Sequence, residues 1–98
     1  MKYNSPLEAL ACLGETPEAI RRSLALMGIR GRRLVCSDCP ITHYLRQVWS
    51  ETTWAGPTAI VSDYNEHETV FDTPPVVREF MRKFDSREFP ELIEGVGK

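Results

Sequence analysis

Proline accompanies four of the helix starts that this sequence predicts, and these starts constrain the fold more than any other feature. Ser5-Pro6-Leu7-Glu8 is a capping box with proline at the first helical position. Thr16-Pro17-Glu18 repeats the pattern, Pro40 begins a third helix and Thr73-Pro74-Pro75 begins a fourth. The chain is therefore expected to form several short helices.

The spacing of apolar residues supports these helices and sets their ends. The first should run over residues 6–13 and stop at Gly14, and the second should end at Gly28. Apolar residues then fall at helical spacing along one face of each later helix. They are Ile20, Leu24 and Met27 in the second, Ile41, Tyr44, Leu45, Val48 and Trp49 in the third, and Val76, Val77, Phe80, Met81 and Phe84 in the fourth. Ser86 is predicted to cap a last short helix that holds Phe89, Leu92 and Ile93.

Two β-rich runs lie between the third and fourth helices. Residues 58–62 and 69–71, joined by the turn-like sequence DYNEH, predict a hairpin. A lone hairpin is only marginally stable, so it must pack on the helices or gain a third strand, for which residues 34–36 are the candidate.

These elements predict an α+β fold. It is a single compact domain over residues 1–98, with four or five short helices on a small antiparallel hairpin or three-stranded sheet. Residues 95–98 should form a flexible tail. The expected core is Leu24, Met27, Ile41, Leu45, Val48, Trp49, Ile60, Val70, Phe80 and Phe84.

Composition is that of an ordinary globular protein, with 42% hydrophobic and 27% charged residues. No apolar run approaches the roughly 20 residues that span a bilayer, and residues 1–14 are too polar for a signal peptide, so a cytoplasmic location without membrane contact is expected. Three cysteines do not suggest a disulfide framework.

Charge is distributed unevenly along the chain. Residues 1–50 carry seven basic and four acidic side chains, whereas residues 51–98 carry five basic and ten acidic ones. The basic half would face either an acidic partner or the acidic half of the same molecule.

The stretch GIRGRRLVCSDCPITHY, residues 28–44, holds three of the six candidate binding residues. Its arginines precede a helix start, and such a position suits an acidic protein partner or another anion. The predicted surface comprises Arg30, Arg32, Arg33, Arg21, Arg22 and Arg46. The same stretch is also explained by a structural role at the start of the third helix. In that interpretation Asp38 or Cys39 caps the helix, and Gly28 and Gly31 supply turns.

A second hypothesis for this stretch is a metal or thiol site. Cys36, Cys39 and His43 supply three ligands, whereas a structural zinc site takes four. Cys39 at a helix start beside His43 would also suit a reactive thiol, because the helix pattern turns both away from the apolar face. No complete catalytic constellation is present, so we expect neither an enzyme nor a cofactor.

A third hypothesis rests on residues 10–24, LACLGETPEAIRRSL, which resemble a helix-turn-helix. Ile20 would point inward, and Arg21 and Arg22 would lie on the recognition helix, which makes nucleic acid an alternative partner. Leu10 and Glu15 depart from the motif at positions where it has a small and an apolar residue. Two capped helices joined by a tight turn explain the same sequence.

The segments GIRGRR…CSDCPITHYL and PPVVREFMRKFDSREFPEL are similar to segments of small actinobacterial and actinophage proteins of unknown function. Those proteins share a G-x-R-G…C-P-[IL]-x-x-Y-L segment and a later P-x-x-V-x-x-F-[VM]-x-x-F-D segment. The resemblance implies a common fold, and a chain that is phage-encoded or actinobacterial. The function that we expect is that of a small non-enzymatic binding or regulatory protein.

Overall fold

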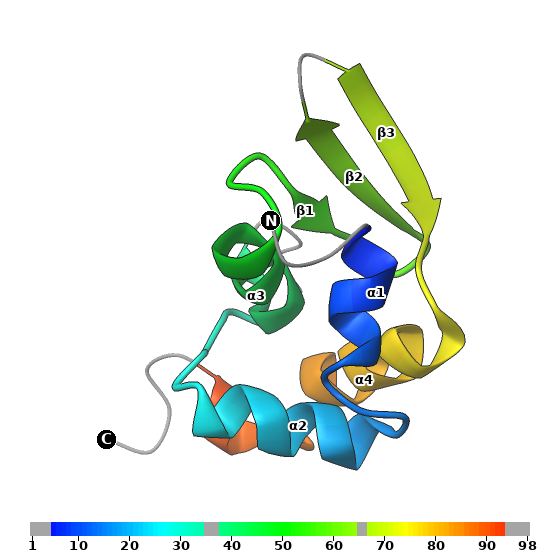
Figure 1. The fold of residues 1–98 in the computed structure, drawn as a ribbon. Helices are drawn as coiled ribbons and strands as arrows, with labels where there is room; N and C mark the ends of the chain where they lie inside the picture. Colours follow the sequence, from blue (N-terminus) through cyan, green and yellow to red (C-terminus); the bar gives the residue numbers. More distant parts are fainter. Residues whose placement is uncertain (1–4, 35–37, 65–66, 94–98) are drawn as a thin grey trace.

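A computed structural model describes residues 5–34, 38–64 and 67–93 of the chain (Figure 1). In chain order the elements are α1 (Pro6–Ala11), α2 (Pro17–Leu26), α3 (Pro40–Val48), β1 (Trp54–Ala55), β2 (Ala59–Tyr64), β3 (His67–Asp72), α4 (Pro75–Asp85) and the short 3-10 helix η2 (Pro90–Leu92). The architecture is a small α+β domain, which confirms the predicted fold class.

The helices begin where the proline-led signals predict. Ser5 and Thr16 accept hydrogen bonds from the backbone N–H groups of Glu8 and Ala19, at 3.3 and 3.1 Å. Cys39 is the N-cap of α3, and its Sγ accepts a hydrogen bond from the Thr42 N–H at 3.4 Å. Proline follows each of these caps, where its missing N–H removes no helical hydrogen bond.

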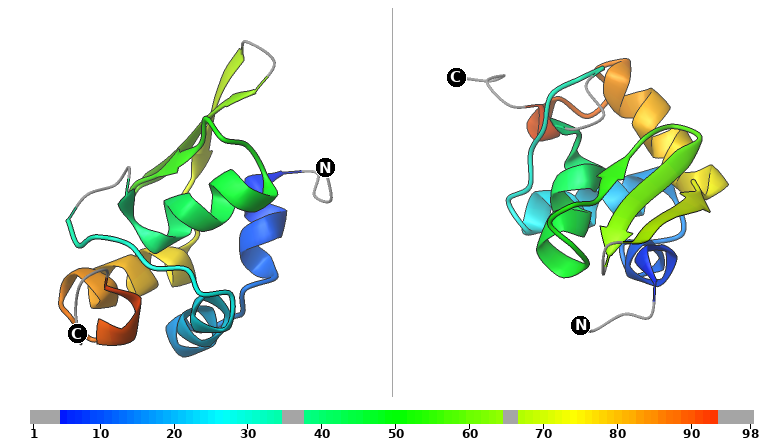
Figure 2. Two further views of the ribbon diagram at one scale, coloured as in Figure 1. Left: turned by 90° about the vertical axis from the view of Figure 1, so that its left-hand side faces the viewer. Right: turned by 90° about the horizontal axis from the view of Figure 1, so that it is seen from above.

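The three strands form an antiparallel sheet in the order β1-β2-β3. Ala55 pairs with Ile60, which pairs with Phe71, and these three side chains face the helices. The next row, Trp54, Val61 and Val70, faces away from them. Figure 2 shows that the β2–β3 hairpin projects beyond the helical body, so only the base of the sheet is covered.

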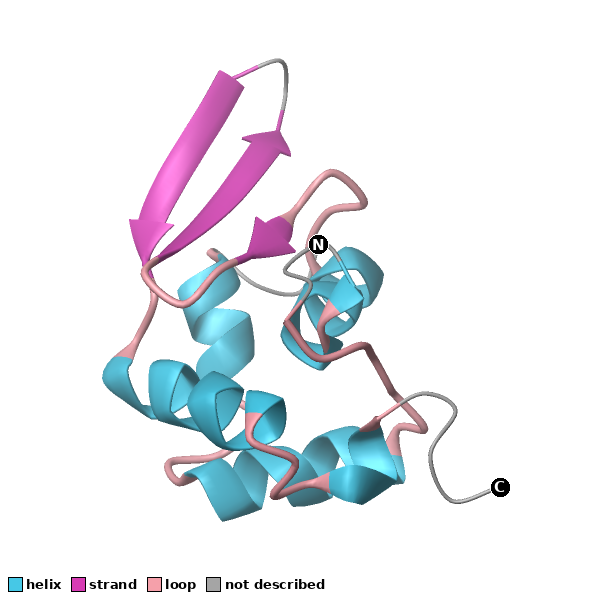
Figure 3. Ribbon diagram, turned by 180° about the vertical axis from the view of Figure 1, so that it is seen from behind, coloured by secondary structure: helices cyan, strands magenta, loops and turns pink. Residues whose placement is uncertain are grey.

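The core lies between the base of the sheet and the helices (Figure 3). Phe80 is fully buried and its ring stacks against those of Phe84 and Phe89, with centroid separations of 6.3 and 5.2 Å. Ile20 and Leu24 are fully buried where α2 packs on α4. The predicted core is confirmed for most members, with Val48 and Trp49 at its margin.

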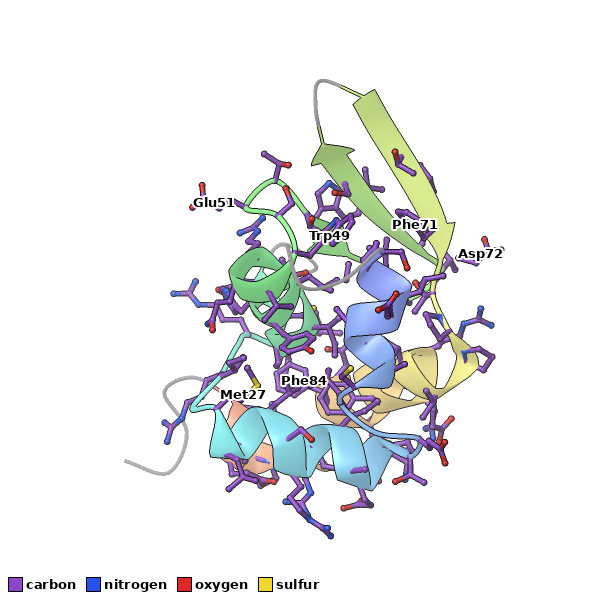
Figure 4. The ribbon with its side chains drawn as sticks, viewed as in Figure 1. Met27, Trp49, Glu51, Phe71, Asp72 and Phe84 are labelled. Atoms are coloured by element: carbon purple, nitrogen blue, oxygen red, sulfur yellow. The ribbon has the colours of Figure 1, made fainter. Side chains whose placement is uncertain are left out.

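Hydroxyl groups join the sheet to α3 inside this core. The Ala55 N–H donates to Thr42 Oγ1 at 2.9 Å, and Thr53 Oγ1 donates to Ser62 Oγ at 3.1 Å. Trp49, which lies between α3 and the sheet, donates its indole N–H to the same Ser62 oxygen (Figure 4). All buried side-chain N and O atoms of the described residues have partners.

A second set of contacts joins the segment after α2 to the segment after α4. The Gly31 N–H donates to Leu92 O at 2.9 Å, and Gly31 forms a parallel bridge with Ile93. The Arg32 N–H donates to Asp38 O at 2.8 Å. These bonds fix the path of the chain from α2 toward α3.

Four predictions about the fold need correction. Met27 and Val70 are 46% and 58% exposed, because Met27 follows the last turn of α2 and Val70 is on the outer sheet face. The third strand is formed by Trp54–Ala55 and not by the predicted residues 34–36. Leu34 lies in a turn, and Val35, Cys36 and the predicted tail at 95–98 lie outside the described residues. Ser86 ends α4, and η2 begins after Phe89.

No helix in the described part of the chain is both long enough and apolar enough to span a membrane.

Candidate binding surface

Two large apolar side chains are exposed at the C-terminal end of α2. Leu26 is 83% exposed and Met27 is 46% exposed. Gly28 then adopts a φ of +71° and turns the chain, so that the Ile29 N–H reaches Leu24 O at 3.0 Å and Ile29 is buried. Leu26 is exposed because it lies on the face of α2 opposite Leu24, and the turn leaves Met27 outside the core (Figure 4, Met27 labelled).

Arginines flank these apolar side chains. Arg22 is exposed one helical turn before Leu26, and residues four apart lie on the same face of a helix. Arg30 is exposed just after the turn. Within the described residues, neither arginine forms an ion pair or side-chain hydrogen bond. We call Arg22, Leu26, Met27 and Arg30 the α2-end surface.

Arg32 adjoins this surface and keeps most of its side chain in solvent. Its Nε lies 3.2 Å from Asp38 Oδ2, yet the side chain is 68% exposed. The other Asp38 oxygen lies 2.5 Å from His43 Nε2. Gly28, Ile29, Arg30, His43 and Gln47 line an open recess of about 370 Å³. The α2-end surface is thus continued by a shallow recess with basic and polar walls.

The other three predicted binding arginines have structural partners. Arg21 donates to Glu91 at 2.9 Å and to Glu18 at 3.0 Å, and these hydrogen bonds raise its pKa above the ordinary value for arginine. Arg33 Nη1 donates to Asp85 O at 2.6 Å.

Arg46 Nε likewise donates to a backbone oxygen, Thr53 O, at 2.9 Å. Of the six predicted arginines, Arg22, Arg30 and Arg32 are therefore the ones whose side chains are exposed.

Cys39 does not point away from the core as expected. It is 8% exposed, and its sulfur lies 3.4 Å from Thr42 Oγ1 and 3.8 Å from Ala55 O. The reason is that β1 covers the second face of α3. The thiol also lines an apolar cavity of about 190 Å³ whose other walls include Phe80 and Met81.

The structure describes two members of the predicted zinc or thiol site, Cys39 and His43. These two side chains have different neighbours. His43 contacts Asp38, whereas Cys39 contacts β1. Cys36 lies outside the described residues. Over residues 5–34, 38–64 and 67–93, no group of three or more histidine, cysteine or carboxylate side chains is placed to hold a metal ion.

The predicted helix-turn-helix segment consists of α1, α2 and the turn between them. Ile20 is buried as expected, and Ser23 Oγ donates to Leu13 O at 2.7 Å across the turn. Gly14 has a φ of +142° and lies so close to Ala19 that a side chain at this position would overlap it. Arg22 is exposed, but Arg21 is held by Glu91. DNA binding by this segment stays a prediction.

Leu26 and Met27 are the part of the surface that the sequence analysis missed. Leu26 does not share the face of Ile20 and Leu24, and it follows Arg22 by four positions. An apolar residue on the charged face of an amphipathic helix was the available signal.

Comparison of the chain with protein-family models, with curated proteins and with solved structures found no match to any of them.

Proposed function

We propose that this chain is a small, non-enzymatic binding or regulatory protein that acts in the cytoplasm and contacts an acidic partner through the α2-end surface and Arg32. The observation that carries the proposal is the exposure of Leu26 and Met27 between Arg22 and Arg30. The two quoted segments further support a place among the actinobacterial and actinophage proteins.

The chemistry of the surface suits an amphipathic helix that carries both acidic and apolar residues. Burying an exposed leucine contributes about 1.5–3 kcal/mol, which favours a partner with apolar side chains. Arg22 and Arg30 favour carboxylates beside those side chains, and they add specificity and a faster association that weakens with salt. A purely polar anion would leave Leu26 in water.

The test uses a fluorescent peptide of about 16 residues in which glutamate and leucine alternate at helical spacing, with anisotropy as the measurement. Leu26→Ser should weaken binding about tenfold or more, and Arg30→Glu should weaken it most at low salt. Arg78→Glu is the matched control, because α4 begins on the opposite side of the molecule from the end of α2 (Figure 1).

Three results would contradict the proposal: no binding of the peptide, equal losses for Arg30→Glu and Arg78→Glu, or no preference for this peptide over one in which serine replaces leucine.

DNA binding is the second candidate function, and the exposure of Arg22 on α2 favours it. Duplex DNA in the same assay should then bind with an affinity that falls steeply with salt and should depend on Arg22. Zinc or thiol chemistry at Cys36, Cys39 and His43 is the third candidate. It predicts about one equivalent of zinc in the purified protein or rapid labelling of Cys39, whereas the burial of Cys39 predicts slow labelling.

A further inference from the structure

The outer face of the sheet carries an exposed apolar row. Trp54, Val61 and Val70 lie directly opposite one another across the three strands. Trp54 is 43% exposed and Val70 is 58% exposed, although side chains in such cross-strand pairs also shelter one another. No described helix covers this face (Figure 2).

Acidic side chains border this row. Glu68 and Asp72 lie two residues before and after Val70, on the same face of β3, and both are exposed. Asp72 points away from the helices (Figure 4). In the sequence, residues 47–77 contain five acidic residues and no lysine or arginine. The described charged side chains on this face of the sheet, Glu68 and Asp72, are thus both acidic, and the sheet lies at the opposite end of the molecule from α2 (Figure 1).

The hydrogen-bond pattern shows which backbone groups of β3 face outward. The Thr73 N–H donates to Thr58 O at 3.1 Å, so these two residues form a hydrogen-bonded pair. Such pairs alternate along antiparallel strands, so Thr69 and Phe71 also bond to β2. The N–H and C=O groups of Glu68, Val70 and Asp72 point the other way, toward the open edge of the sheet.

This edge lacks three of the features that commonly protect edge strands. The sequence of β3, HETVFD, contains neither proline nor lysine, and its register with β2 has no bulge. Its charges do oppose pairing with a second copy. A twofold antiparallel pair centred on Val70 would place Glu68 of each copy opposite Asp72 of the other, and like charges in that position are destabilising.

From these observations we infer that β3 is a docking edge for an extended basic segment of a partner protein, which adds to the sheet as a fourth strand. Its backbone would bond to Glu68, Val70 and Asp72, as in other cases of strand addition. The register requires the pattern basic-x-apolar-x-basic, with the basic side chains beside Glu68 and Asp72 and the apolar one beside Val70. This surface is separate from the α2-end surface, so the inference does not depend on the function proposed above.

The first test is amide hydrogen exchange measured by NMR with a capped peptide. In this peptide, lysine, valine and lysine occupy every second position in that order, and threonine occupies the positions between and beside them. With the peptide at ten times its Kd, exchange at Glu68, Val70 and Asp72 should slow about tenfold. Exchange at Thr69 and Phe71, which already bond to β2, should change much less. Protection without this alternation, or no protection, would overturn the inference. Alternating protection without any peptide would show instead that the occupant is a second copy.

The second test is a charge reversal. Glu68→Lys with Asp72→Lys should remove binding of the lysine peptide and create binding of its glutamate counterpart. Glu15→Lys with Glu51→Lys makes the same change in net charge away from β3, and it should preserve the native preference. If the reversal variant does not fold, Glu68→Gln with Asp72→Asn should weaken binding of the lysine peptide about threefold to tenfold at low salt. Equal effects of the sheet variant and the control would refute docking at β3.

Discussion

Gly31 and Gly28 are both required by the turn between α2 and α3, but for different physical reasons, and this difference can be measured. A side chain at Gly31 would have its Cβ 2.7 Å from Pro40 N and 2.8 Å from the carbonyl carbon of Cys39, both of which are backbone atoms. Backbone atoms cannot rotate away as a side chain can. At Gly28 a Cβ would have no neighbour within 4 Å, but the φ of +71° is unfavourable for alanine.

The expected losses of stability follow from these two situations. Gly28→Ala should lower the free energy of unfolding by about 1–2 kcal/mol, because only the left-handed conformation is penalised. Gly31→Ala forces the backbone apart, which costs about 1–3 kcal/mol by overpacking. It also weakens the hydrogen bonds from the Gly31 and Arg32 N–H groups, worth about 0.5–1.5 kcal/mol each. The total for Gly31→Ala is therefore about 2–6 kcal/mol.

Urea unfolding monitored by tryptophan fluorescence measures both losses, and a constant m-value would show that the unfolded states are comparable. For a domain of this size, a loss of 3 kcal/mol lowers Tm by about 12–24 °C. If Gly31→Ala is as stable as Gly28→Ala, the close approach of residues 38–40 to Gly31 is refuted.

Further predictions concern the core, the cysteines and acid stability. Phe80→Ala should lower the free energy of unfolding by about 3–5 kcal/mol in the same urea assay, and a loss below about 1 kcal/mol would contradict its place in the ring stack. A thiol reagent followed by peptide mapping should label exposed Cys12 in the native protein, but should label Cys39 only as fast as the protein opens. The hydrogen bond from Arg82 lowers the pKa of Glu79 in the folded protein. The pair therefore stabilises the fold at pH values above the pKa that Glu79 has in the unfolded chain. This stabilisation is lost as the pH falls through the pKa of Glu79 in the folded protein. Glu79→Gln should therefore reduce the loss of stability in acid, and an unchanged pH profile of unfolding would count against the pair.

Local signals in the sequence were sufficient for most of the secondary structure. Caps and prolines act within three or four residues, so the starts of α1, α2 and α3 follow from the sequence alone. The strand β1 could not be predicted, because it has two residues and is held by partners outside itself. Those partners are the Thr42 hydroxyl and β2, and neither is adjacent to it in the sequence.

Periodicity also identifies apolar faces without showing what covers them. Met27 continues the spacing of Ile20 and Leu24, yet it lies past the end of α2 and in solvent. Cys39 is on the polar side of α3 by spacing, yet β1 buries it. In both cases the outcome depends on a neighbouring segment whose position the pattern does not contain.

The accessibility of the arginines is decided by residues far along the chain. Arg21 is held by Glu91, 70 residues away, and Arg33 is held by the carbonyl of Asp85, 52 residues away. The sequence could indicate a cluster of arginines, but only the fold separates the exposed ones from those with structural partners.

The contact of Gly31 with Leu92 and Ile93 has a consequence for the order of events during synthesis. The segment that closes the turn after α2 is made about 60 residues later, which at ribosomal speeds is a delay of roughly 3–12 s. For most of that interval α2 also lacks α4, the helix on which Ile20 and Leu24 pack, because α4 ends at Asp85. The hydrogen bond and bridge that close the turn after α2 can therefore form only after Leu92 and Ile93 have been made.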